Sequence, residues 1–587
     1  MRSTVVILTV LVCATVVVAQ EETSPIFLDH ADQVEVVQKG DSYVTYVVGN
    51  VDFRTETGHI YCDSAIWQRG NFIRLRGHVV LDDERYRLAA DSVFYNVRTD
   101  AITARGANVE LWSYEDSLFA AGTHAYYDRN REFFYMEERP VLYLRYPDSA
   151  RMIEVIADNI QYDAATRRAE ADGDVVITSQ DISSRSGCAV MNLDDDVLDL
   201  FESPRVRRGE SEVSGELITV VFENDTLRMI DVIDSAHGEF TEPVDIDSTD
   251  FDRSTLKGNR IILSFNHGEL SQILCYGQAY SWYFPSTRGS DEFNENTVSG
   301  DTIRFTVENN RLMEVDVIGG AVGTFLTGET MVTDDTTRTP QVDTIDYRSR
   351  FIFYKVVDSV ITLIEAGHVE SGTVSLDAHE ILFDTKRQVI EAYSAVIDTL
   401  VADTMHTDSS EPPSLGILPN TIPVILQDKE DRIFGDYLEY SIDTEKGRIV
   451  QSKSAYEAGY YYGGRLFREQ KHIFYVDGGR YTTCELGEPH YHFHSKSMKL
   501  IEGEKLIAKP VIFYIGRIPI AAIPYYVFPL KKGRHSGFLP FTFGRFERGE
   551  RYVRNVGYYW AASEYWDWRG SFDYLEQSRT LIFNTAV

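Results

Sequence analysis

From Gly77 to Arg105 the sequence reads GHVVLDDERYRLAADSVFYNVRTDAITAR. Short runs that alternate apolar and polar residues flank a turn-forming segment at 96–100. Alternation with a period of two, broken by turns of this composition, indicates paired β-strands. No stretch of the chain shows the apolar periodicity of an amphipathic helix of four turns. We therefore predict an all-β fold.

The same pattern recurs from about residue 49 to about residue 449. Its core, an acid followed four residues later by Tyr and then Asn or Asp, lies at 91–96 and returns at 158–163, 377–384 and 436–440, with weaker copies at 123–128, 187–192 and 301–307. Early copies are about 30 residues apart, which indicates a repeat architecture. One unit is too small to bury its own apolar face, so the units are expected to stack.

Stacked units would share one inward apolar surface. In the first copies it would be formed by Val79, Leu81, Val93, Tyr95, Ile102, Val109 and Leu111. Two arrangements fit the periodicity equally well: a closed β-helix with a dry, filled core, and an open folded sheet with an apolar trough. Taken residue by residue, the filled core is the simpler interpretation.

Residues 1–19 predict a secretory signal peptide. They carry one cation, Arg2, then an apolar stretch from Val5 to Val18 and a small residue, Ala19, at the expected cleavage site; a membrane anchor would be longer. Val12 is too large to favour lipid attachment at Cys13. No other stretch reaches 18 apolar residues, so a membrane would have to be crossed by strands.

The net charge of −34 narrows the range of ligands that the chain can bind. It argues against nucleic acid as a partner and against electrostatic capture of anionic headgroups. If the ligand is a phosphorylated lipid, its acyl chains must supply most of the affinity.

Residues 479–545 predict a bent, partly unpaired β region. Apolar segments that resemble strands are interrupted there by Pro519, Pro524, Pro529 and Pro540. Proline removes a ladder donor and is confined to edges, bends and bulges of sheets. After it, Val556, Tyr558 and Trp560 alternate with polar residues, as do Trp568, Phe572 and Tyr574. This alternation is typical of transmembrane β-strands, and an ordinary amphipathic hairpin is the alternative.

Few residues suggest catalysis or metal binding. His490, His492 and His494 alternate along one expected strand, which would place three imidazoles on one face. A metal site there is a weak alternative to a packed or solvated strand face. The acidic runs Asp82-Asp83 and 194–196 are interpreted as solvated turns. Because no nucleophile elbow, phosphate-binding loop or HExxH pattern is present, we expect no enzyme and no cofactor.

The junction resembles the LPS-assembly protein family LptD, also known as the organic solvent tolerance or OstA-like family. The matching pieces are, in order, 481–484 (YTTC), 489–491 (PHY), 518–519 (IP), 524–530 (PYYVFPL), Arg534, 536–540 (SGFLP) and 557–560 (GYYW). Ordered and spaced matches over about 80 residues are far more specific than one short motif.

The resemblance implies a fold and a domain order. OstA-like β-jelly-roll repeats, V-shaped in section and also called a β-taco, would stack in the periplasm before the first strands of an outer-membrane β-barrel. The implied domains are a signal peptide (1–19), an OstA-like domain (20–285), a second OstA-like region (286–480) with a Pro-rich insertion (403–424), the junction (481–540) and the first barrel strands (541–587). Since the family's barrel is very large, we expect this sequence to be a fragment or a truncated product.

The resemblance also implies lipopolysaccharide transport and assembly at the outer membrane. Lipid A chains would pass along the trough and leave through a lateral gate, where the four prolines weaken strand pairing. The implied partners are lipopolysaccharide, an LptA-like periplasmic bridge and an LptE-like plug lipoprotein. The family's junction cysteine, here Cys484, forms a disulfide with cysteines late in the barrel; an unpaired thiol is the alternative. The residues also admit a β-solenoid scaffold without lipid cargo and a metal-dependent enzyme that uses the three histidines.

Overall fold

The computed structural model describes most of the chain. The described ranges are 26–39, 42–115, 117–145, 152–180, 182–223, 226–243, 251–284, 292–309, 311–331, 339–396, 421–428, 431–442, 444–456, 459–470, 472–484, 486, 489–502, 504–529, 536–539, 541–545, 551–563 and 565–587. Within these ranges every regular element is a strand, which confirms the predicted all-β class. The same residues include no helix with the length and apolar character needed to cross a bilayer. The predicted signal peptide lies outside the described residues.

The chain divides into an N-terminal unit, 1–319 with 327–341, and a C-terminal unit, 320–326 with 342–587. Strands of the N-terminal unit are β1 (Phe27–His30), β2 (Gln33–Lys39), β3 (Ser42–Arg54), β4 (Gly58–Gln68), β5 (Phe72–Asp83), β6 (Tyr86–Asn96), β7 (Ala101–Ser113), β8 (Leu118–Asp128), β9 (Phe133–Glu137), β10 (Val141–Arg145), β11 (Met152–Ile156), β12 (Asn159–Asp163), β13 (Arg168–Ser179), β14 (Ile182–Asn192), β15 (Val197–Phe201), β16 (Arg205–Arg208), β17 (Ser211–Ser214), β18 (Leu217–Glu223), β19 (Thr226–Pro243), β20 (Phe251–Asn266), β21 (Glu269–Phe284) and β22 (Glu292–Glu308). β23 (Arg311–Met331) and β24 (Thr339–Lys355) contribute residues to both units.

Strands of the C-terminal unit are β25 (Val360–Ser371), β26 (Val374–Asp384), β27 (Val389–Tyr393), β28 (Ala395–Val396), β29 (Thr421–Ile422), β30 (Val424–Asp428), β31 (Asp431–Gly435), β32 (Tyr437–Ser441), β33 (Gly447–Tyr456), β34 (Gly459–Gln470), β35 (Ile473–Thr482), β36 (Tyr491–Ile501), β37 (Lys505–Ile515), β38 (Ile518–Ile523), β39 (Tyr526–Pro529), β40 (Gly537–Phe538), β41 (Thr542–Arg545), β42 (Arg551–Ala561), β43 (Asp567–Leu575) and β44 (Thr580–Ala586).

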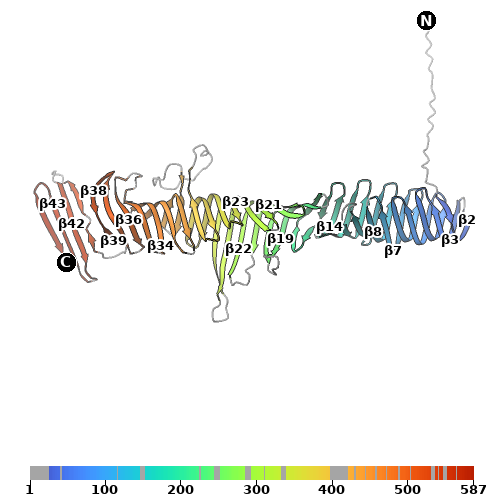
Figure 1. Cartoon of the computed structure of the whole chain (residues 1–587), viewed down its shortest axis with the longest axis horizontal. Helices are drawn as coiled ribbons and strands as arrows, with labels where there is room; N and C mark the ends of the chain where they lie inside the picture. Colours follow the sequence, from blue (N-terminus) through green and yellow to red (C-terminus); the bar gives the residue numbers. More distant parts are fainter. Residues whose placement is uncertain are drawn as a thin grey trace, which may run out of the picture. The chain divides into compact units, whose positions relative to one another are not determined.

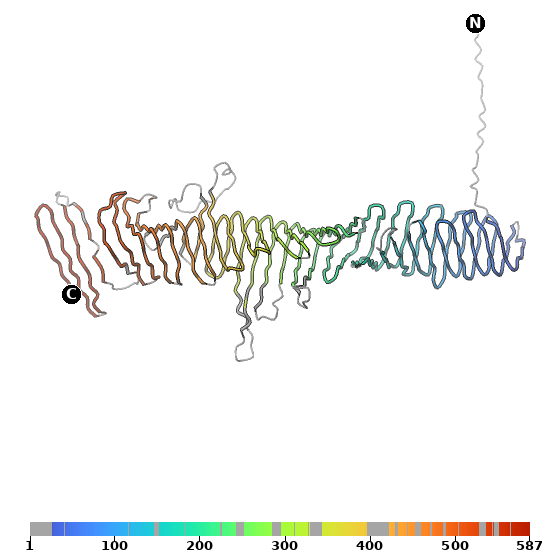
Figure 2. The backbone as a smooth tube through the Cα atoms, viewed as in Figure 1, coloured from blue at the N-terminus to red at the C-terminus, as the bar shows by residue number. Residues whose placement is uncertain are grey.

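In the N-terminal unit consecutive strands pair antiparallel and follow one another from β3 to β8 (Figure 1). Most of these strands are bent near the middle, where the register shifts by a residue or more. The bend can also split a strand in two, since β9 and β10 both pair with β8, and β11 and β12 both pair with β13. The backbone therefore winds repeatedly between two sheet halves (Figure 2).

At several bends a glycine lies against an acid that comes before it in the chain. Gly77 of β5 has φ 76°, and a Cβ added there would lie 2.2 Å from Oδ2 of Asp63. His78 Nδ1 lies 2.9 Å from the same carboxylate oxygen. The contact recurs at Gly49 with Asp32, Gly106 with Asp91 and Gly173 with Asp158. The repeated acid thus occupies the corner, and the apolar residues that follow it enter the interior.

We expect Gly77→Ala to destabilise the N-terminal unit by about 2–4 kcal/mol, because alanine would combine a left-handed backbone with a clash against Asp63. Gly70 is a matched control. Its φ of 71° is also left-handed, but a Cβ there meets nothing within 4 Å, so Gly70→Ala should cost only about 1 kcal/mol. Urea unfolding of both variants checks this. Equal losses would show that the corner contact contributes nothing beyond backbone strain.

The two sheet halves form two apolar walls, each a row of residues that pair directly from strand to strand. Wall 1 runs through Ala65, Leu75, Val93, Ala104, Ala125, Met136, Ile160, Ala171, Ala189, Leu200, Ile218, Val232, Ile261, Cys275 and Ile303. Wall 2 runs through Phe53, Ile60, Leu81, Leu88, Leu111, Ala120, Leu142, Val155, Ile177, Ser184, Val206, Val213, Gly238, Leu256, Ser281 and Val298. All of these residues are buried. Cross-strand stacking of this kind supplies the shared core that the repeats required.

The C-terminal unit also meanders, with antiparallel pairs joining β33 to β34, β35, β36 and β37 in turn. Its core cluster consists of Met498, Leu506, Ala508 and Val511, with Tyr461 and Phe493 packed against it. A separate five-stranded sheet follows, in which β42 pairs with β40, β41 and β43, and β43 pairs with β44. No domain boundary predicted from the sequence is tested by this division, so those boundaries stay predictions.

Candidate functional site

The seven residues expected to face inward are all buried, at 0–6% exposure. Val93, Tyr95 and Ile102 lie on the wall 1 side of the bends, whereas Val79, Leu81, Val109 and Leu111 lie on the wall 2 side. The sequence pattern identified them as inward residues, but it could not assign them to two opposed surfaces.

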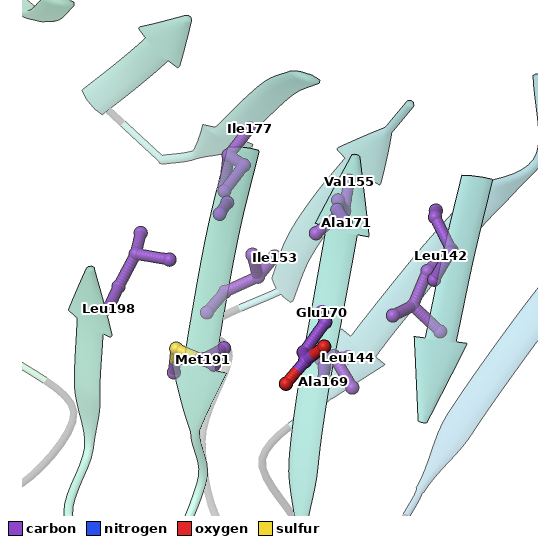
Figure 3. A pocket seen from close by; sticks show the side chains of 12 residues that line it. Leu142, Leu144, Ile153, Val155, Ala169, Glu170, Ala171, Ile177, Met191 and Leu198 are labelled. Atoms are coloured by element: carbon purple, nitrogen blue, oxygen red, sulfur yellow. The ribbon is translucent and has the colours of Figure 1, made fainter. Parts of the chain in front are cut away.

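The two walls face each other across one interior (Figure 3). A cavity of about 20 Å³ between them is lined by Leu142, Val155 and Ile177 from wall 2 and by Ala171 and Ala189 from wall 1, among others. That volume holds about one water molecule. At this position the interior is therefore apolar and has room for little more than one water molecule.

Because the strands bend at these corners, each one forms a V whose apex is the corner and whose arms end at the turns, and we call the side where the arms end the mouth. On the wall 1 side the mouth is bounded by the turns at 96–101 and 128–133, and on the wall 2 side by the turns at 83–86 and 113–118. A ligand that occupied the interior while keeping a bulky polar part in water would have to pass this mouth.

Polar and aromatic contacts bridge the mouth. Arg129, on the wall 1 side of the mouth, donates to Asp83 Oδ2 on the wall 2 side at 3.2 Å. Arg85 on the wall 2 side pairs with Glu132 on the wall 1 side, and the rings of Tyr86 and Tyr127 meet edge to face at 4.7 Å. Farther along, Arg208 Nη2 donates to the Gly268 carbonyl across the same mouth at 2.7 Å. A cavity of about 50 Å³ lies at the bridge and is lined from both walls.

The interpretation of Asp82-Asp83 as a solvated turn is wrong for Asp83. Its side chain is only 9% exposed, because it folds toward Arg129, whose side chain is 17% exposed. Arg129 also donates to Tyr95 Oη at 3.3 Å and to Asp100 Oδ1 at 3.4 Å. Burial alone would lower the pKa of Arg129, but the neighbouring Tyr86, Asp100 and Tyr95 outweigh it and the pKa is raised. The guanidinium therefore stays charged inside the mouth.

At the junction, two short strands share one partner. β38 and β39 both pair with β37, and the chain bends at Pro524 between them. Pro519 lies where the β37–β38 register shifts, and Pro529 is the last residue of β39. No ladder joins β38 or β39 to the five-stranded sheet within the described residues. Pro540 lies outside them.

Apolar side chains are exposed both on β38 and on the five-stranded sheet. All six residues of β38 are exposed, Ile518 at 65%. On the five-stranded sheet, Trp560 pairs with Trp568, and Phe572 pairs with Phe583, so the four rings share one face. They are 36–76% exposed. Arg569 and Asp573 alternate with these rings on β43, which matches the expected apolar and polar faces.

The cysteines and histidines of the junction form no metal cage. Among the residues that the structure describes, no group of three or more His, Cys, Asp and Glu side chains is placed to hold an ion. Cys484 is a free thiol whose Sγ lies 3.6 Å from His490 Nδ1. The rings of His492 and Tyr514 stack at 4.8 Å, and His494 meets Tyr514 edge-on at 6.3 Å. A disulfide of Cys484 stays a prediction.

A buried lysine lies on a neighbouring strand. Lys453 of β33 is 6% exposed, and its Nζ has no hydrogen-bond partner. Its described contact is with the ring of Tyr462, 4.9 Å from the amine. Burial lowers the pKa of Lys453 from 10.5 to about 8. Nothing in the local sequence marks this residue, whose neighbours in the sheet are Phe434 of β31 and Tyr462 of β34.

We expect Lys453→Met to raise the free energy of unfolding by as much as about 3 kcal/mol below pH 8, since each unit of pKa shift corresponds to about 1.4 kcal/mol. The gain should shrink between pH 8 and pH 10.5, because there the wild-type amine is already neutral in the folded chain while the unfolded chain still binds the proton. Urea unfolding at pH 7 and pH 9.5 measures it. Lys496→Met on the exposed part of β36 is the control and should change little.

Family models and curated proteins match two parts of this sequence. The model of the OstA-like protein family matches residues 23–181, and the model of the LptD protein family matches residues 506–581. The LPS-assembly protein LptD of Pseudomonas syringae pv. syringae is 30% identical over 122 residues, which is 20% of this chain and 13% of that protein. The LptD of Acinetobacter baumannii is 26% identical over 113 residues, 19% of this chain and 14% of that protein.

Among solved structures, the chain is similar to LptH of Pseudomonas aeruginosa, described as the LptA homologous periplasmic component of the lipopolysaccharide transport device. The identity is 15%, with a TM-score of 0.18 over 30% of this chain and 94% of that chain. The chain spans about an eighth of the length of the curated relatives it matches.

Proposed function

We propose that this chain is an LptD/OstA-like protein and that it carries lipopolysaccharide to the outer membrane along the interior between its two walls. The observation that carries the proposal is the continuity of those walls. Buried apolar residues pair from β4 to β22 with no charged side chain in either row.

An interior of this kind suits acyl chains. Each methylene group that leaves water contributes roughly 0.8 kcal/mol to the binding free energy. A row without fixed polar partners lets an acyl chain slide from one rung to the next, where a rung is one bent strand with its two arms. Ser184 and Ser281 are the only hydroxyl-bearing residues in wall 2, and neither carries a charge. This agrees with the net charge of the chain, which leaves most of the affinity for a phosphorylated lipid to its tails.

Transport along this interior requires the walls to part. The cavity of about 20 Å³ is too small for an acyl chain, so each rung must open as the lipid passes. The glycine corners provide the hinge side of the V. The contacts between Arg129 and Asp83 and between Arg85 and Glu132 are then the ones that must break, because the polar part of the lipid stays in water outside the mouth.

The junction supplies the exit. We assign the five-stranded sheet with its exposed rings to the outer membrane, as the first barrel strands. The prolines at 519, 524 and 529 leave β38 and β39 without a ladder to that sheet among the described residues, and together with Pro540 they form the lateral gate. In this proposal 20–480 is periplasmic, an LptA-like protein delivers the lipid, an LptE-like lipoprotein plugs the barrel, and no reaction is catalysed.

Photocrosslinking tests the conduit. Photoreactive residues at Val93 and Leu111 face the interior, while Phe94 and Glu110 on the same strands face outward and serve as matched controls. In a reconstituted system that exports lipopolysaccharide, the two inner probes should crosslink lipid A when transport is energised, and the two outer probes should not. Crosslinks absent from Val93 and Leu111 while the exporter works would leave a β-solenoid scaffold without lipid cargo.

A further inference from the structure

Four residues with cationic, phenolic or imidazole side chains lie together in the C-terminal unit. Lys453, Tyr462, Arg480 and His494 pair directly across β33, β34, β35 and β36. Directly paired residues point to the same side of a sheet, and Tyr461 and Phe493, their neighbours in sequence, pack on the core cluster. The row therefore lies on the face opposite to that core, with His492 two residues from His494 on the same strand.

We call Lys453, Tyr462, Arg480 and His494 the Lys453 row. Within the described part of the chain, neither this row nor His492 has an acidic partner. Among the described residues none of Lys453, Arg480, His492 and His494 forms an ion pair with a carboxylate. Lys453 Nζ, His492 Nδ1 and His494 Nδ1 are buried without hydrogen-bond partners. Elsewhere in the described residues Arg129 is paired with Asp83, Arg260 with Asp231, and Arg304 with Asp316.

An unpartnered buried amine is costly to keep, and it is the more notable in a chain whose net charge is −34. Burial lowers the pKa of His492 and His494, and the charge of Arg480 lowers both further. Lys453 and Arg480 therefore share one face of the sheet with two imidazoles, and none of the four is paired with a carboxylate among the described residues.

We propose that the Lys453 row and His492 form a binding site for a phosphate monoester. The ammonium and guanidinium groups supply donors for several phosphate oxygens, and an imidazole N–H adds another. The backbones of Lys453 and Arg480 are about 10 Å apart, two strand spacings, so their long side chains can converge on one phosphate. Tyr514 holds both imidazoles in place, and exposed Arg480 provides the entrance.

The site does not depend on the lipid-conduit proposal. A phosphorylated sugar headgroup and free phosphate present the same chemistry, so the site would take either. The row gives an acidic chain a local means of contacting an anionic ligand.

Calorimetric titration of inorganic phosphate into the full chain in detergent tests the site. Wild type should bind, and phosphate should raise its melting temperature. Arg480→Gln and Lys453→Met should each weaken binding by about tenfold or more, as expected from loss of a charge-assisted hydrogen bond. Arg465→Gln is the matched control, because Arg465 of β34 is already paired with Asp477 at 3.2 Å, and it should leave binding within about twofold.

A second titration identifies the source. N-acetylglucosamine 1-phosphate, with N-acetylglucosamine as the neutral control, should bind more tightly than inorganic phosphate if the site reads a headgroup; equal affinity assigns it to free phosphate. The proposal is overturned if wild type binds no phosphate, or if Lys453→Met and Arg480→Gln bind it as wild type does. Lys453→Met removes a buried charge and should fold, so a loss of binding cannot be attributed to unfolding.

Discussion

Linking the two sides of the mouth should stop lipid from entering the N-terminal unit. With cysteines at 85 and 132 (Arg85→Cys, Glu132→Cys) joined by a short bifunctional methanethiosulfonate, lipid A crosslinks at Val93 should fall by roughly tenfold or more, because the open rung would no longer be populated. The native side chains at these two positions pair across the mouth and are 60% and 39% exposed, so both cysteines are accessible to the reagent.

The control joins two turns of the same wall. Tyr114 is 52% exposed, and its backbone N–H donates to the Arg85 carbonyl at 2.8 Å, so a link between Arg85→Cys and Tyr114→Cys leaves the mouth free. That variant should transport normally, and reduction should restore transport in the first. Normal crosslinking at Val93 with the mouth fully linked would mean that lipid does not use this opening.

A carboxylate placed in wall 1 should cause the largest loss of stability. Ala104 is 0% exposed and pairs with Val93 on one side and Ala125 on the other. Ala104→Asp would bury a charge with no partner in the row, at a cost of about 3–5 kcal/mol. Urea unfolding and hydrogen exchange of β6, β7 and β8 measure the loss. The same variant should block lipid at this rung if it still folds.

Thr103 is the matched control on the same strand. It pairs with Phe94 and Tyr126 on the outward side, so Thr103→Asp should change stability by only about 0.5 kcal/mol. Similar losses for Ala104→Asp and Thr103→Asp would show that the interior of the V is wet, and an acyl-chain conduit would then lose its physical basis.

The repeat signal in the sequence was sufficient for the fold class and for the inward residues. Alternation with a period of two is a local property of a strand, so Val93, Tyr95 and Ile102 could be assigned to the interior without knowing what they face. The prolines at 519 and 524 likewise marked the bends of the junction, since a missing N–H acts on its own strand. The role of Gly77 and Asp63 as a corner was not foreseen.

Contacts between distant turns required the fold. Asp83 was assigned to a solvated turn because Arg129, its partner, is 46 residues away, and no local pattern reports such a pair. Lys453 and Arg480 carry no motif either, and only the registers of β33 to β36 place them in one row with His494.

The sequence by itself determined that this chain is all-β, repeats a strand-turn unit and buries one face of each strand, because those properties follow from residue spacing along a single strand. Only the tertiary structure decided that the buried face forms two opposed walls, that charged side chains bridge their mouth and that unpaired nitrogens share one face of β33 to β36. Register and bending set these relations, and both arise from the pairing of one strand with another, which no single strand reports.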